Sequence, residues 1–110
     1  MTVVTGRPGC GKSTYVDAHR EPDDLVWDYD VILAALDGGL PRDDSGRHRG
    51  TMEALRRAFL ANVQITGDGV WMIVTDPNYG HRIARDFGGA HVTEDGVREW
   101  RLAHPLEVTA

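Results

Sequence analysis

One glycine-rich octet near the start of the chain has the residue types and the spacing to bind phosphate. Residues 6–13 read GRPGCGKS and fit the pattern G-x-x-x-x-G-K-[ST], which is called the P-loop. Glycines in such a loop let successive backbone N–H groups point at phosphate oxygens. Among 110 residues of average composition this pattern arises by chance roughly once in a few hundred chains. The octet therefore predicts a site for a nucleotide, ATP or another NTP.

Each position of the loop has an expected role. Lys12, the only lysine beside eleven arginines, should reach the β- and γ-phosphates, and the Ser13 hydroxyl should bind Mg²⁺. Cys10 is either a reactive thiol or, as we prefer, a small side chain at a variable position of the motif. The residues expected to contact the nucleotide are Gly6, Arg7, Pro8, Gly9, Cys10, Gly11, Lys12, Ser13 and Thr14.

Two aspartates follow the predicted strand at Leu25–Trp27. In a parallel α/β sheet ligands bind at the carboxyl ends of the strands, so both carboxylates should face the same crevice as the P-loop. We expect Asp30 to act as general base toward an acceptor hydroxyl, and Asp28 to support it or to bind a magnesium-bound water. Alternatively, one of them caps the helix predicted from Val31.

A third aspartate, Asp76, comes just after the apolar run at Val70–Val74. An acid that follows a buried strand in this way suits a metal site, and we expect Asp76 to hold Mg²⁺ together with Ser13. Asp before Pro is equally the pattern of a helix N-cap with proline at the first helical position. Asn78 could instead provide that cap, which would leave Asp76 to the metal.

The arginines fall into two groups. We interpret the first group as part of a solvated surface, because acidic neighbours offset its positive charge. The alternative is that these arginines clamp the phosphate of an acceptor. The second comes where a phosphotransferase needs positive charge over the moving phosphoryl group, and Arg82 and Arg85, three residues apart on a predicted helix, are its candidates. Exposed decoration is the alternative for each. The first group is Arg42, Arg47, Arg49, Arg56 and Arg57; the second is Arg82, Arg85, Arg98 and Arg101.

Strands and helices are predicted to alternate along a single domain, residues 1–110, which favours an α/β fold with a small, mostly parallel sheet. The loop at Asp37–Gly50 is long enough to act as a lid. The tail at residues 94–110 is either a hairpin about Asp95-Gly96 or a short helix that carries Arg98 and Arg101. The predicted strands are Val3–Thr5, Leu25–Trp27, Val70–Val74 and Ala90–Thr93; the predicted helices are 12–20, 31–36, a segment through Met52, Leu55, Phe59 and Val63, and 79–87.

Composition and charge limit the partners and the cell compartment that we expect for this protein. The net charge of −5 argues against a surface that coats long nucleic acid, although a local pocket for a nucleic acid end remains compatible with it. No apolar run is long enough to span a membrane, no secretory signal is visible, and the single cysteine fits a reducing compartment. We expect a cytoplasmic protein. Nothing in the sequence indicates an oligomer.

Three segments together resemble a family, the P-loop kinases of the polynucleotide 5′-hydroxyl kinase type, with zeta-toxin-like and nucleotide kinases as relatives. They are GRPGCGKST, VWDYD and MIVTDPN, and the resemblance covers about residues 1–95. The chain is also similar to small kinase-like P-loop proteins of actinobacteria and their phages. The resemblance implies a three-layer P-loop NTPase fold, with Asp30 at the position of the family's general base and Asp76-Pro77-Asn78 at its Asp-x-Asn turn.

The chain departs from that family in two places. Val31, Ile32 and Leu33 stand where the family has an arginine shortly after the general base. We also expect a minimal fold that lacks a full lid, with Arg98 and Arg101 as a possible remnant of it.

Two functions are therefore expected. The first is a phosphotransferase that moves the γ-phosphoryl group of Mg·ATP to a hydroxyl or phosphate of a nucleotide or nucleic acid end. The alternative is a weakly catalytic nucleotide-binding module, or a plain NTPase, that acts by sequestering a nucleotide or docking to a partner.

Overall fold

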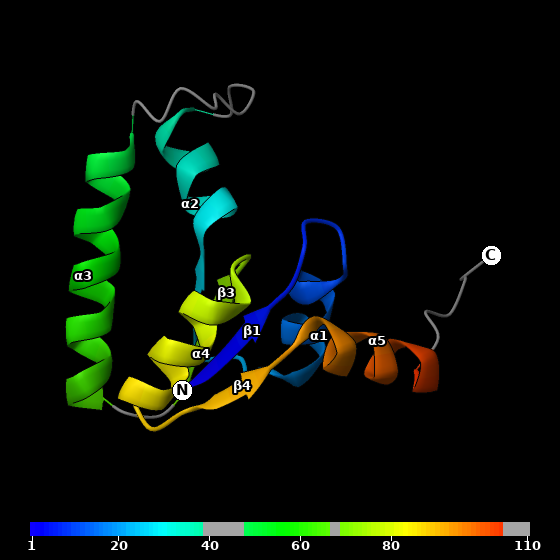
Figure 1. The fold of residues 1–110 in the computed structure, drawn as a ribbon. Helices are drawn as coiled ribbons and strands as arrows, with labels where there is room; N and C mark the ends of the chain where they lie inside the picture. The colour runs from blue at the N-terminus through cyan, green and yellow to red at the C-terminus, as the bar shows by residue number, and fades with distance from the viewer. Residues whose placement is uncertain (39–47, 67–68, 105–110) are drawn as a thin grey trace.

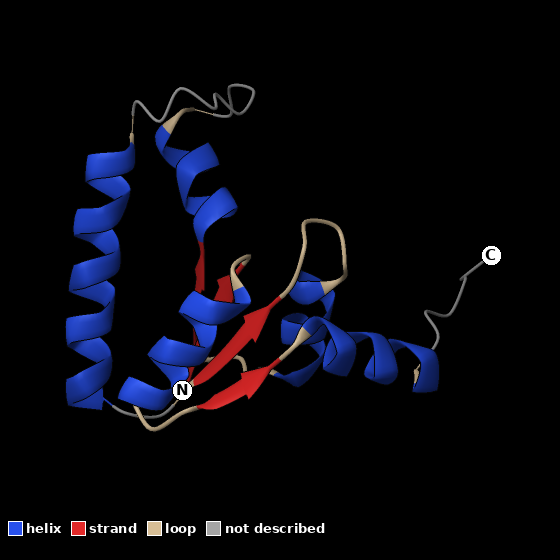
Figure 2. Cartoon of the chain, viewed as in Figure 1, coloured by secondary structure: helices blue, strands red, loops and turns tan. Residues whose placement is uncertain are grey.

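The protein has an α/β fold built on a small parallel sheet (Figures 1 and 2). The computed structural model describes residues 1–38, 48–66 and 69–104. In these ranges the four strands are all parallel and run in the order β2-β3-β1-β4. The elements are β1 (Thr2–Thr5), α1 (Lys12–His19), β2 (Leu25–Asp28), α2 (Tyr29–Leu36), α3 (Arg49–Thr66), β3 (Val70–Val74), α4 (Pro77–Asp86), β4 (Ala90–Val92) and α5 (Glu94–Ala103).

Helices cover both faces of the sheet. Val3 and Val4, neighbours in β1, are both fully buried, because successive side chains of a strand point to opposite faces. Val3 belongs to a core with residues of α3 and α4, whereas Val4 belongs to a core with residues of α1 and α5. The first core contains Val3, Trp27, Met52, Met72, Ile83 and Ala84; the second contains Val4, Val16, Ile73 and Val97.

The register of the sheet brings the ends of three strands to one edge. Thr5 of β1 pairs with Val74 of β3, and Asp28 of β2 pairs with Ile73 of β3. The P-loop, the start of α2 and the start of α4 therefore leave the sheet at the same edge (Figure 2). This is the edge at which ligands bind in open parallel sheets.

The tail is helical up to Ala103, so the hairpin about Asp95-Gly96 is wrong for this segment. Thr93 caps the helix, its Oγ1 accepting a hydrogen bond from the N–H of Gly96 at 3.3 Å. Val97 is fully buried against α1, and this burial favours a helix over an exposed two-stranded ribbon. Residues 105–110 lie outside the described residues.

Several predicted boundaries shift for reasons of capping. The second helix begins at Tyr29 rather than Val31 because Asp28 is its cap, and the fourth begins at Pro77 rather than Tyr79 because Asp76 is its cap. Most of the predicted lid loop, with Arg42 and Arg47, lies outside the described residues. In the part of the chain that is described, no helix is both long and apolar enough to cross a bilayer.

Close packing of α4 on β1 depends on Gly80. A Cβ at this buried position would collide with the side-chain methyl of Thr5 and lie 3.2 Å from Cγ1 of Val3. We expect Gly80→Ala to destabilise the fold by about 1–3 kcal/mol, although alanine is the better helix former. Gly50→Ala is the matched control, since a Cβ there meets nothing within 4 Å, and it should be neutral or stabilising. Urea unfolding of the two variants measures the difference; equal effects would contradict this account of the packing.

Candidate functional site

The P-loop runs from the end of β1 to the start of α1. Gly9 and Gly11 have φ angles of 80° and 100°, in the left-handed region that glycine adopts without strain. Gly11 is the N-cap of α1, and no side chain caps the backbone N–H groups of its first turn. These groups and the positive end of the helix dipole therefore face the loop, which is an arrangement that favours phosphate.

Lys12 ties the two ends of the loop together. Its side chain is nearly buried, with 9% of the residue exposed, and Nζ donates to the carbonyl oxygens of Gly6 at 2.5 Å and Arg7 at 2.8 Å. An ammonium group has three donors, and buried charges need such partners. Cys10 packs over Gly6, where an added Cβ would lie 2.7 Å from its Sγ.

Asp28 links β2, α2 and the P-loop helix. Its Oδ1 accepts hydrogen bonds from the N–H groups of Asp30 at 3.2 Å and Val31 at 3.5 Å, which makes it the cap of α2. Its Oδ2 accepts a hydrogen bond from Oγ of Ser13 at 3.4 Å. The cap expected among the two aspartates is thus Asp28, and Asp30 lies in the first turn of α2 with its side chain on the exposed side.

Asp76 is the N-cap of α4. Its Oδ1 accepts a hydrogen bond from the N–H of Asn78 at 2.9 Å, and Pro77 follows it at the start of the helix. The interpretation of Asn78 as the cap is therefore wrong. The carboxylate that the geometry joins to Ser13 is Asp28 rather than Asp76. Within the described ranges no group of three or more His, Cys, Asp or Glu side chains could hold a metal ion.

Two cavities meet at this edge of the sheet. The P-loop cavity has a volume of about 500 Å³ and the lateral cavity, on the side of α3 and α4, about 380 Å³. Both are lined by Lys12, Asp28 and Asp30. The P-loop cavity is lined by Pro8, Gly9, Gly11, Lys12, Ser13, Thr14, Asp28, Asp30, Val31, Ile73 and Arg101. The lateral cavity is lined by Pro8, Lys12, Trp27, Asp28, Tyr29, Asp30, Arg56, Met72, Ile73, Val74, Thr75, Asp76, Tyr79 and Arg82.

Arginines that the sequence placed in one group have different surroundings in the structure. Arg82 of α4 lines the lateral cavity, whereas Arg85 pairs with the adjacent Asp86 at 3.3 Å and lines neither cavity. Arg56, which we had interpreted as exposed surface, also lines the lateral cavity. A sequence signal that the interpretation missed separates Arg56 from its neighbour Arg57. Arg56 comes four residues after Met52 and three before Phe59, so it lies on the apolar face of α3, whereas Arg57 lies off that face.

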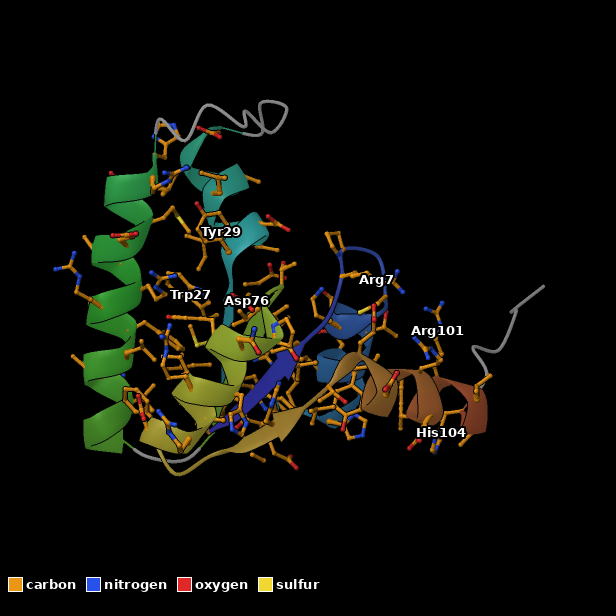
Figure 3. All side chains as sticks on the ribbon, viewed as in Figure 1. Arg7, Trp27, Tyr29, Asp76, Arg101 and His104 are labelled. Carbon is orange, nitrogen blue, oxygen red and sulfur yellow. The ribbon has the colours of Figure 1, made fainter. Side chains whose placement is uncertain are left out.

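Arg101 reaches the P-loop from α5. A Cβ at Gly11 would lie 3.1 Å from Nη1 of Arg101, and Arg101 lines the P-loop cavity. Figure 3 shows Arg7 and Arg101 beside the P-loop, away from Trp27, Tyr29 and Asp76 on the other side of the sheet. A guanidinium group from α5 is thus added to the positive charge of Lys12 at the P-loop.

Glu94, at the start of α5, braces the opposite end of the loop. Its Oε1 accepts hydrogen bonds from Nε of Arg7 at 2.9 Å and from the backbone N–H of Arg7 at 3.3 Å. These contacts lower the pKa of Glu94 and raise the pKa of Arg7, in both cases chiefly through the side-chain hydrogen bond between them. The first residue after Gly6 is therefore held to α5 by charge.

Comparison of the chain with protein-family models, with curated proteins and with solved structures finds no match.

The Arg7–Glu94 pair predicts a pH-dependent contribution to stability. Because the pKa of Glu94 is lowered in the folded protein, the unfolded chain binds more protons at acidic pH, and the contribution is present above the ordinary carboxyl pKa of about 4.5. As the pH falls through the folded pKa this contribution is lost. The difference in unfolding free energy between wild type and Glu94→Gln should therefore be larger at pH 7 than at pH 3.

Urea titrations at both pH values measure that difference, and the exposed Glu99→Gln on the same helix serves as control. Added salt should reduce the effect at pH 7, since the pair is solvent-exposed and screened. A difference that is independent of pH would contradict an ionic role for Glu94.

Proposed function

We propose that the protein is a phosphotransferase with a minimal P-loop NTPase fold that moves the γ-phosphoryl group of Mg·ATP, or of another NTP, to an acceptor. The acceptor is a hydroxyl or phosphate of a nucleotide or a nucleic acid end. The observation that carries the proposal is the meeting of two cavities at Lys12, Asp28 and Asp30. A transfer reaction needs a donor and an acceptor site that share such a boundary.

The P-loop cavity suits the donor. The backbone N–H groups around Gly9 and Gly11 and the first turn of α1 would surround the phosphates, and Lys12 would neutralise charge on the β- and γ-phosphates. For this, Nζ of Lys12 must exchange at least one of its carbonyl partners for a phosphate oxygen. Arg101 stands where it would add a second cation to the same phosphates.

Ser13 and Asp28 fit Mg²⁺. The two oxygens, 3.4 Å apart, are the hard donors that Mg²⁺ prefers, and Mg²⁺ commonly takes one or two protein ligands while waters and substrate phosphates supply the rest. When bound, the ion would neutralise charge that develops on the phosphates. Asp76 is a further carboxylate along the lateral cavity, although its Oδ1 is engaged in capping α4.

Asp30 is the proposed general base. It lines both cavities and can accept the proton of an acceptor hydroxyl in the lateral cavity while the hydroxyl oxygen bonds to the γ-phosphorus. The bond between the γ-phosphorus and the bridging oxygen breaks, and the nucleoside diphosphate leaves. Asp28 keeps Asp30 in place through the cap of α2, since it accepts a hydrogen bond from the backbone N–H of Asp30.

The second candidate function is a weakly catalytic nucleotide-binding module or plain NTPase, acting by sequestration or by docking to a partner. One observation favours it: the residue at the boundary, Asp30, is exposed, so water has access to the position of the acceptor hydroxyl. Incubation with Mg²⁺, γ-labelled ATP, 5′-hydroxyl DNA, 5′-hydroxyl RNA and nucleoside monophosphates separates the two. Label on an acceptor supports the phosphotransferase, and label released only as phosphate supports the alternative.

Removal of the Lys12 ammonium should weaken nucleotide binding. We expect Lys12→Ala to lower the affinity for Mg·ATP at least about tenfold, as loss of a charge-assisted contact of about 1.5–3 kcal/mol implies. Lys12→Met, which keeps the apolar stem of this nearly buried side chain, guards against a folding defect. Calorimetric titration with ATP and a circular dichroism spectrum measure both properties; wild-type affinity in the folded Met variant would refute the P-loop assignment.

Loss of the Asp30 carboxylate should affect turnover rather than binding. Asp30→Asn is expected to lower the rate of phosphoryl transfer by about 10²–10⁴-fold, the usual contribution of a general base, with ATP affinity unchanged. Asp17→Asn, an exposed aspartate on α1, is the control. If Asp30→Asn transferred phosphate at the wild-type rate, Asp30 would not be the base.

A further inference from the structure

The lateral cavity has two arginines that share one aromatic ring. The guanidinium carbon of Arg56 lies 5.0 Å from the centre of the Tyr79 ring, and that of Arg82 lies 5.5 Å from it. Arg56 belongs to α3, and the other two residues belong to α4. All three line the cavity, so a guanidinium group from each of two separate helices contacts the same ring there.

This cluster carries an excess of positive charge. The one carboxylate within ion-pair distance of either guanidinium, among the residues described, is Glu53, whose oxygen is 4.0 Å from Nη2 of Arg56 and half exposed. Two like charges close to one ring repel each other, and an anion that contacts both of them lowers that cost. Guanidinium groups match the geometry of phosphate, which they can bind with two parallel hydrogen bonds.

The arginine cluster also lies within the length of a small molecule from Asp76, at the edge of the sheet where the P-loop begins. Asp76, Tyr79 and Arg82 come at intervals of three residues from the N-cap of α4 onward, and all three line the lateral cavity. At a rise of about 1.5 Å per residue, Arg82 is about 9 Å along the helix axis from Asp76. A molecule held by the arginines can therefore extend to the boundary with the P-loop cavity.

Aromatic side chains also line the lateral cavity. Trp27 and Tyr29 line the cavity together with Met72, and Figure 3 shows Trp27 and Tyr29 on the side of the sheet that faces α3. Trp27 is 4% and Met72 0% exposed, so the half-buried ring of Tyr29 is the flat surface that a nucleobase could contact. The volume of about 380 Å³ is that of a small-molecule site, and the net charge of −5 disfavours a long polyanion.

We infer that Arg56 and Arg82, positioned by Tyr79, form a clamp for the phosphate of the acceptor, and that the acceptor is a nucleoside monophosphate. This inference rests on the proposed function, because only in that function is the bound monophosphate an acceptor. The binding of the monophosphate can still be measured without any transfer reaction. The clamp selects for a substrate that already carries a phosphate group. Tyr79 is a positioning residue, because it acts through the two guanidinium groups.

The test is calorimetric titration of the full chain with adenosine, guanosine and their 5′- and 3′-monophosphates, with the P-loop saturated by a non-hydrolysable ATP analogue and Mg²⁺. At least one monophosphate should bind at least about tenfold more tightly than its nucleoside. Arg56→Ala and Arg82→Ala should each remove most of that preference, with the affinity for the ATP analogue unchanged. Arg57→Ala, an exposed neighbour on α3, is the matched control and should keep the preference.

Tyr79 has a conservative variant that separates positioning from packing. Tyr79→Phe keeps the ring and should bind the monophosphate like wild type, whereas Tyr79→Leu should weaken binding of the monophosphate several-fold without weakening binding of the ATP analogue.

Three results would overturn the inference. They are equal affinity for nucleoside and monophosphate, the same loss in Arg57→Ala as in Arg56→Ala, and tighter binding of a 5′-hydroxyl oligonucleotide than of any mononucleotide. If the ATP analogue itself fails to bind, the proposed function fails, and titration with the monophosphates alone still decides the clamp.

Discussion

The parallel pairing of β3 with both β1 and β2 is the constraint on which the rest of the structure depends. β3 lies between the two strands, with Thr5 opposite Val74 and Asp28 opposite Ile73. In this register the P-loop, Asp28 and Asp76 all emerge at one edge. A slip by one residue would turn every side chain of a strand to the other face, and the two cores on opposite faces of β1 would be lost.

Helix caps and the candidate chemistry use the same carboxylates. Asp28 satisfies N–H groups of α2 with one oxygen and accepts a hydrogen bond from Ser13 with the other. Asp76 caps α4 and also lines the lateral cavity. Because a capping aspartate is fixed by backbone N–H groups, its second oxygen has a defined position at the site. Asp30, in the first turn of α2, lines both cavities and is the carboxylate that we propose as general base.

Elements near both ends of the sequence meet at the P-loop. Glu94 holds Arg7, and Arg101 lies against Gly11, so α5 contacts the P-loop at two points about two helical turns apart. The tail that had two interpretations from sequence is therefore part of the site. On the other face α3 and α4 supply Arg56 and Arg82 to the lateral cavity. Each cavity thus has cations from a helix that is distant from the P-loop in sequence.

The sequence by itself determined what depends on local patterns. The P-loop octet, the apolar strand at Val70–Val74, and the capping potential of Asp28 and Asp76 can be recognised from neighbours a few residues away, because turns, strands and caps are short-range structures. Only the tertiary structure decided that helices distant in sequence supply arginines to the same cavity. Arg56 shares the helix face of Met52 and Phe59, and the packing of that face on the sheet brings it to the cavity that Arg82 of α4 also lines. The tertiary structure also decided that residues 94–103 form a helix. Val97 is buried against α1, and such a long-range contact cannot be recognised from a local sequence pattern.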